Sequence, residues 1–377
     1  MSDYPIKADT PQEDEHEFTR ISENHQPHHR RRLRNLFCRK YQTQDIPELA
    51  NITAPEKVKK IHEEYLNAGA KFIRTNTFAS NKETLQEDFA EVEKNIQAAV
   101  EIARDAVNGR DAWIAGDIGP IPVNGAEDAA AAADEYYQIA KTFAECGVTV
   151  LDFETFADLD GILPAIKKIC AEYEMFIMVS FSVNQFGYSA AGLSAKRLLA
   201  DAAAVPEIDA VGLNCGVGPA HMRQILEKAG RPVDKFLLAI PNAGYPTLTR
   251  NKLQFGNTPA YFAEKMKELQ ALGTDILGGC CGTTPEHIHK TKLVCDDIPV
   301  CEITDKNRTV ISSYSHAVTF GGRPILIGER INPTGKPKFK QALKDKDLTY
   351  ILSMGVAQQE SRADVLDVNV GLPGIDE

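Results

Sequence analysis

Between residues 47 and 295 the chain alternates between helical segments and short apolar runs, and this alternation restricts the fold more than any other feature. The apolar runs are continuous, as expected of strands that are buried on both faces of a parallel sheet. The longest predicted helix covers residues 82–107. The predicted strands are residues 71–75, 113–117, 148–154, 175–181, 210–214, 236–240 and 275–277.

Polar residues gather at or just after the carboxyl ends of these strands. They are Asn76, Asp117, Glu154, Ser182, Cys215, Asn242 and Cys280. A (β/α)8 barrel keeps its active site at this end of its strands. An open, doubly wound sheet is the alternative, but it would not need polar groups at nearly every strand end. The pattern therefore predicts an α/β fold with a TIM barrel over residues 43–295.

Two adjacent cysteines, Cys280 and Cys281, occupy a glycine-rich turn between the last predicted strand and a helix that starts at residues 283–286. Adjacent cysteines rarely pair with each other, because the peptide between them is too short for a relaxed disulfide. They can share a soft metal ion if a third ligand comes from elsewhere. Cys215, flanked by glycine at another strand end, is the candidate. We predict one metal held by three thiols; the alternative is three core residues.

Composition excludes several classes of function. A net charge of -11 argues against nucleic acid as the main partner. The sequence has no apolar run of about 18 residues and no export signal, which predicts no membrane span and a cytoplasmic protein. In that compartment the eight cysteines are expected to stay reduced. The remaining cysteines are predicted to be core or surface thiols: Cys38, Cys146, Cys170, Cys295 and Cys301.

The two ends of the chain differ from the middle. Residues 1–42 carry charges of both signs, four of the nine histidines and little apolar periodicity, which predicts a disordered N-terminal segment. Residues 296–320 are predicted to be a linker. A second αβ pattern follows over residues 321–377, with a helix at 338–361 and a strand at 365–370. Two strands and one helix cannot bury a core, so an incomplete second α/β barrel is expected.

Four motifs carry a resemblance to a known family: Asn214-Cys215, residues 278–283 (Gly-Gly-Cys-Cys-Gly-Thr), residues 75–78 (Thr-Asn-Thr-Phe) and residues 241–244 (Pro-Asn-Ala-Gly). From about Pro47 onward the sequence resembles the homocysteine S-methyltransferase family, most closely the N-terminal part of the cobalamin-dependent methionine synthases. The resemblance implies that residues 43–295 are a zinc barrel that binds homocysteine. It also implies that residues 321–377 are the truncated start of a pterin-binding domain.

The resemblance implies roles for individual residues. Cys215, Cys280 and Cys281 would be the zinc ligands. Glu154 would hold the substrate ammonium, with Asp117 and Asn76 on the same rim, and Asn242 would lie near the zinc as a candidate fourth ligand. Strand-end acids can instead cap helices or anchor loops, and Asn242 can simply shape a turn. Asn332, Asp367 and Asn369 resemble pterin-contacting positions.

The chemistry implied is methylation of homocysteine to methionine. Three thiolates leave zinc one open position, and a metal-bound thiol is deprotonated at neutral pH and can attack a methyl donor. Methylcobalamin, methyltetrahydrofolate and a cobalamin-carrying module or protein are implied only by resemblance to the longer family members. One alternative is a thiol methyltransferase that uses a sulfonium or ammonium donor. The other is a non-catalytic fragment that binds zinc and homocysteine.

The sequence departs from the family at its beginning. Family members start their barrel with a strand that runs into an Asp-Gly-Ala-Met-Gly-Thr-like turn, which helps to bind homocysteine. No such run occurs here; residues 1–42 stand in its place, and residues 33–38 are a poor substitute. We therefore expect a barrel whose first strand is atypical or missing, with two unpaired edges.

Overall fold

The computed structural model describes residues 40–41, 46–123, 126–232, 234–244, 246–249, 252–296, 309–313 and 316–374. The chain divides into two compact units, Met1–Glu302 and Ile303–Glu377, which are described separately below. Apart from Lys40 and Tyr41, the predicted N-terminal segment lies outside the described residues. So do Cys38 and Cys301. None of the described helices is both long and apolar enough to cross a lipid bilayer.

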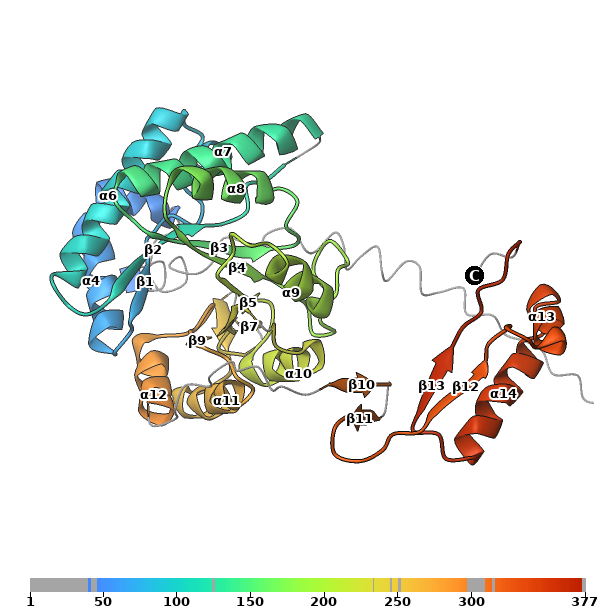
Figure 1. Cartoon of the computed structure of the whole chain (residues 1–377). Coiled ribbons are helices and arrows are strands. Elements are labelled where there is room, and N and C mark those ends of the chain that lie inside the picture. Colours follow the sequence, from blue (N-terminus) through green and yellow to red (C-terminus); the bar gives the residue numbers. More distant parts are fainter. Residues whose placement is uncertain are drawn as a thin grey trace, which may run out of the picture. The chain divides into compact units, whose positions relative to one another are not determined.

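The first unit is built on one parallel sheet whose strands follow each other in chain order (Figure 1). This order confirms the seven predicted strands and argues against the doubly wound alternative, in which the strand order reverses. The strands are β1 (Phe72–Arg74), β2 (Trp113–Ile118), β3 (Val150–Phe156), β4 (Phe176–Phe181), β5 (Ala210–Asn214), β6 (Phe236–Ile240) and β9 (Ile276–Leu277).

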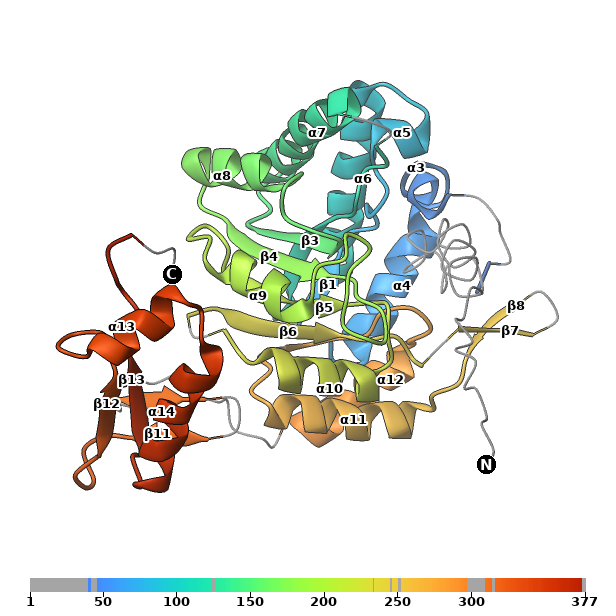
Figure 2. The ribbon, with the colours of Figure 1, turned by 90° about the vertical axis from the view of Figure 1, so that its right-hand side faces the viewer.

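Helices connect these strands and cover the outside of the curled sheet (Figures 1 and 2). A hairpin of β7 (Pro246–Thr249) and β8 (Lys252–Phe255), which the sequence pattern did not predict, projects between β6 and the next helix. The helical segments are η1 (Pro47–Leu49), α3 (Ala50–Thr53), α4 (Pro55–Asn67), α5 (Lys82–Leu85), α6 (Phe89–Val107), α7 (Ala126–Glu145), α8 (Leu163–Glu172), α9 (Ala195–Ala203), α10 (Pro219–Ala229), α11 (Pro259–Ala271) and α12 (Pro285–Cys295).

The helix predicted over residues 82–107 is wrong as a single element. Gln86 adopts a left-handed conformation with φ 57° and ends α5. Asp88 then accepts a hydrogen bond from the backbone N–H of Glu91 and caps the start of α6. The break has a readable cause, since an aspartate three residues before a glutamate is a common helix start.

The two faces of the sheet carry different side chains. Along β3, Leu151 and Phe153 belong to the large apolar cluster under the helices, whereas Val150 belongs to a small cluster on the inner face. Side chains two residues apart in a strand point the same way. Asp152 and Glu154 therefore share the inner face with Val150. The inner face is polar at its carboxyl end, which is where the functional site is expected.

The sheet is open on one side. Among the described residues no strand lies between β1 and β9, so the first unit is a seven-stranded half-barrel rather than a closed eight-stranded one. A cavity of about 460 Å³ lies along this gap and is lined by β1, β9, α4 and α12. The segments on the two sides of the gap are in contact: the hydroxyl of Tyr65 on α4 donates to the carbonyl oxygen of Thr283 just before α12 (3.3 Å).

One residue in the wall of this cavity predicts how stability depends on pH. His62 on α4 is buried, and burial lowers its pKa from 6.5 to about 4. The unfolded chain therefore binds more protons at this residue between pH 6.5 and 4, so stability is lost as the pH falls through that range. The free energy of unfolding, measured in urea, is expected to fall over that range by up to about 3 kcal/mol more in the parent than in the variant His62→Leu. Parallel pH profiles would contradict this.

The second unit contains a parallel strand pair, β12 (Ile327–Ile331) and β13 (Val365–Val368), connected through α13 (Pro337–Lys344) and α14 (Leu348–Glu360). An antiparallel ribbon of β10 (Val310–Ser312) and β11 (Ala317–Thr319) occupies part of the predicted linker. The helix predicted over residues 338–361 is wrong as a single element, because Lys346 adopts a left-handed conformation, φ 54°, between α13 and α14. This β-α-β unit has a small core around Phe339. The second barrel stays a prediction.

Candidate metal and substrate site

Three cysteines meet at the carboxyl ends of β5 and β9. Cys215 follows β5 directly and has a left-handed backbone, φ 57°. Cys280 and Cys281 follow β9 after two glycines, and the N–H of Cys280 donates to the carbonyl oxygen of Pro241 (2.7 Å). A side chain at Gly279 would lie 2.6 Å from Thr283, so only glycine fits this close turn. The Sγ atoms of Cys215 and Cys280 each lie 3.7 Å from that of Cys281.

These distances fit a shared zinc ion. Two thiolates bound at about 2.3 Å with a tetrahedral angle between them lie about 3.8 Å apart. A disulfide would require about 2.05 Å. The pKa of Cys281 is raised well above its ordinary value because Cys215 and Cys280 hydrogen-bond to it and because it is buried. Metal binding would have to displace this proton.

Asn242 contacts the cysteine pair through the backbone. Its side-chain oxygen accepts a hydrogen bond from the N–H of Cys281 (3.1 Å), and its own N–H donates to the carbonyl oxygen of Val217 (2.9 Å). The residue therefore connects the Cys281 turn to the loop that follows Cys215. Its predicted place near the metal and its alternative role in shaping the turn are both consistent with this arrangement.

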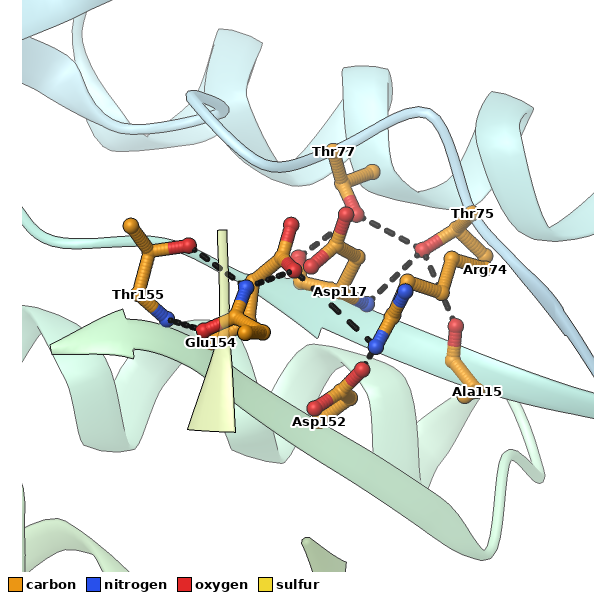
Figure 3. Close-up of polar contacts among 9 residues, drawn as sticks. Arg74, Thr75, Thr77, Ala115, Asp117, Asp152, Glu154 and Thr155 are labelled. Carbon is orange, nitrogen blue, oxygen red and sulfur yellow. Dashed lines mark hydrogen bonds and ion pairs between the residues drawn. The ribbon is translucent and has the colours of Figure 1, made fainter. Parts of the chain in front are cut away.

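Three buried carboxylates lie on the neighbouring strands: Asp117 on β2, and Asp152 and Glu154 on β3. Their oxygens lie within 4.8 Å of one another, and Figure 3 shows all three with Arg74 at the end of β1. Asp117, Arg74 and Cys280 line the same cavity. One carboxylate and one thiol therefore face a common cavity, and both clusters lie at the carboxyl ends of their strands.

Asn214 connects one carboxylate, Glu154, to the strand end that carries Cys215. Its side-chain nitrogen donates to Glu154 Oε2 (2.9 Å) and to Thr155 Oγ1 (2.8 Å), and its oxygen accepts from the Thr155 N–H (2.9 Å). Thr155 has φ 70°, a conformation that costs a β-branched residue about 1–3 kcal/mol. Asn214 holds this turn and immediately precedes Cys215, so the orientation of Glu154 depends on the same strand end as the metal site.

The structure also places the remaining predicted residues. The Asn76 amide donates to the carbonyl oxygen of Pro47 (2.8 Å) and to Asn51 Oδ1 (2.9 Å), which fixes the segment before α4; its substrate role stays a prediction. In the second unit, Asn332 follows β12, Asp367 lies on β13 and Asn369 follows it, so all three are near the carboxyl ends of the strand pair. The Asn332 amide donates to Glu329 Oε1 (2.6 Å).

Sequence reasoning missed Asp152, Arg74 and Asn214 as polar members of the site. The signal for Asp152 was present, because it lies two residues before Glu154 in a strand and must share its face. Arg74 gave a weaker signal: it was read as an ordinary residue within a strand, and its contact with β3 depends on the curl of the sheet. Asn214 was read only as part of a motif.

Comparison with known proteins agrees with this geometry. The sequence model described as homocysteine S-methyltransferase matches residues 22–294. The methionine synthases of Mycobacterium leprae and Mycobacterium tuberculosis are 30% and 29% identical to the chain over 354 and 346 residues. These alignments cover 87% of this chain but only 29% of each relative's length.

The fold also matches a solved structure. The metallated form of the homocysteine methyltransferase MmuM from Escherichia coli superposes with a TM-score of 0.58 and 20% identity, over 68% of this chain and 92% of that chain. This likeness shows the fold of the first unit. The family model covers well over half of the sequence, and both methionine synthases align with most of it. The chain belongs to the homocysteine S-methyltransferase family.

Proposed function

We propose that the first unit binds zinc through Cys215, Cys280 and Cys281 and presents homocysteine for methylation to methionine. The observation that carries the proposal is the set of 3.7 Å Sγ separations beside a buried carboxylate cluster. When bound, zinc would supply a fourth coordination position at which the substrate thiol is held deprotonated at neutral pH.

The carboxylates supply the second point of recognition. Glu154 and Asp117 are buried at the carboxyl end of the sheet, where a cation interacts more strongly with them than it would in water. We assign the α-ammonium of homocysteine to this pair, with Asn214 fixing Glu154 through its 2.9 Å hydrogen bond. A ligand held at both its thiol and its ammonium is oriented for reaction, which is the main contribution that positioning makes to rate.

The methyl donor is proposed from the longer relatives. The chain spans only 29% of the length of its methionine synthase relatives, and the proposed methylation also requires a methyl donor. We propose methyltetrahydrofolate and methylcobalamin as the donors, with a cobalamin-carrying module or protein as the partner. Asn332, Asp367 and Asn369 are proposed pterin contacts. The second β-α-β unit disfavours a sulfonium or ammonium donor, whose enzymes resemble the first barrel alone.

A second candidate is a chain that binds zinc and homocysteine without turnover. In the residues that the structure describes, no strand closes the sheet between β1 and β9, which favours this candidate, since a closed barrel supports its strand ends from both sides. Methyl transfer from free methylcobalamin separates the two candidates. Zinc- and homocysteine-dependent formation of methionine supports the enzyme, whereas binding without product supports the second candidate.

Zinc content and homocysteine affinity test the proposal directly. Purified protein is expected to contain about one zinc per chain, and calorimetry should detect homocysteine binding to zinc-loaded protein only. The chelator-treated protein, reloaded with zinc, is the control for damage. A protein that takes up no zinc at neutral pH, or that binds homocysteine equally well without it, would refute the proposal.

A further inference from the structure

Arg74 lies where it can compete with a substrate ammonium. It is the last residue of β1, yet its guanidinium reaches across β2 to β3 (Figure 3). The register helps to explain the reach: Arg74 pairs with Ala115 and Ala115 pairs with Val150, so the residue of β2 beside Arg74 has only a methyl group. A larger residue at 115 would block this approach.

The guanidinium of Arg74 contacts two carboxylates on β3 and lies closer to one of them. Arg74 Nε donates to Asp152 Oδ2 in a close ion pair, whereas the nearest contact with Glu154 is 3.9 Å, from Nη2 to Oε2. The Asp152 side chain is fully buried and Arg74 is 20% exposed. A buried charge that loses its partner is costly, so a guanidinium released from Asp152 would move to the nearest remaining carboxylate. That carboxylate is Glu154.

We propose that Asp152 is a positioning residue for substrate binding: it anchors Arg74 on one side of the cluster and thereby keeps the guanidinium from hydrogen-bonding to Glu154, from which it stays 3.9 Å away. The cluster then sets three carboxyl groups around one guanidinium, and an incoming ammonium would supply a second positive charge to it. The inference rests on the proposed function, because it assigns the substrate ammonium to Glu154.

The variant Asp152→Asn tests this inference. Its shape is nearly unchanged but its charge is lost, so Arg74 should shift to Glu154. The dissociation constant for homocysteine is expected to rise at least about tenfold. Binding of 4-mercaptobutanoate, which has the thiol and carboxylate of homocysteine but no ammonium, should change less than about threefold. The double variant Asp152→Asn/Arg74→Met, which removes the competing cation, should regain affinity for homocysteine to within about threefold of the parent.

A matched control removes a second ion pair of comparable burial. Arg231 Nη2 lies 2.9 Å from Asp275 Oδ2, with side chains 18% and 10% exposed. Asp275 also lines the cavity, but it precedes β9 and so lies at the amino end of the strands, away from the carboxylate cluster. Asp275→Asn is expected to lower thermal stability without changing the affinity for homocysteine. A purely structural role for Asp152 would give both variants the same profile.

The role proposed for Asp152 and the proposed function would be contradicted by different results. An unchanged homocysteine affinity in Asp152→Asn, equal losses for both ligands, or a double variant that stays weak would overturn it. If the parent itself binds no homocysteine, the proposed function fails. A crystal structure of Asp152→Asn then still tests the ion-pair step of the inference by itself: Arg74 within hydrogen-bonding distance of Glu154 agrees with that step, and Arg74 remaining on residue 152 overturns it.

Discussion

Replacing Cys281 with serine is expected to lower zinc affinity on the order of a thousandfold and to abolish methyl transfer. Zinc sites in small proteins bind with about 10–16 kcal/mol, so one of three thiol ligands carries about 3–5 kcal/mol, or roughly three powers of ten. Cys281 has the central position, because its Sγ is 3.7 Å from both other thiols. Without the metal, the homocysteine thiol would keep its proton at neutral pH.

The control for this substitution is Cys170→Ser on α8. Cys170 is half-buried on α8 and, in the described part of the chain, belongs to neither group of side chains close enough to share a metal ion. We expect this variant to keep about one zinc per chain. Competition with a colorimetric chelator measures both affinities, and unfolding in the presence of the chelator tests for general damage. Cys281→Ser protein with the parent's zinc affinity would show that the metal is held elsewhere.

The strands could be predicted from the sequence because each leaves a local signal. Continuous apolar runs separated by glycine-rich turns identify buried parallel strands, and the polar residues that follow them identify the carboxyl end. The thiol site could be predicted for the same reason. Cys215 and Cys280 each follow a predicted strand, and parallel strands bring their ends to one edge.

The arrangement of the carboxylates could not be predicted in the same way. Whether Arg74 reaches Asp152 depends on the curl of the sheet and on the small side chain of Ala115 between them. The left-handed turn at Thr155 depends on a hydrogen bond from its N–H to Asn214, 59 residues away in the chain. The break at Gln86 was readable from the Asp88 cap, but helical periodicity on both sides concealed it.

Replacing Glu154 with glutamine is expected to weaken homocysteine binding by about a hundredfold while leaving zinc content unchanged. Removing one partner of a buried charge pair costs about 2–5 kcal/mol, and the lower part of that range corresponds to the expected loss. Glutamine keeps an oxygen that can accept the hydrogen bond from Asn214, so the turn at Thr155 should survive. Calorimetric titration of zinc-loaded protein measures the affinity.

A ligand without the ammonium separates charge recognition from structural damage. The dissociation constant for 4-mercaptobutanoate should be the same for the parent and Glu154→Gln within about threefold, because its contacts do not include the glutamate. Asp117→Asn is the comparison at the neighbouring strand, and we expect a smaller loss of homocysteine affinity there, since Glu154 is the residue that Asn214 orients. Equal losses for both ligands in Glu154→Gln would mean that Glu154 supports the fold of the site, and the ammonium would then have to be recognised by other residues.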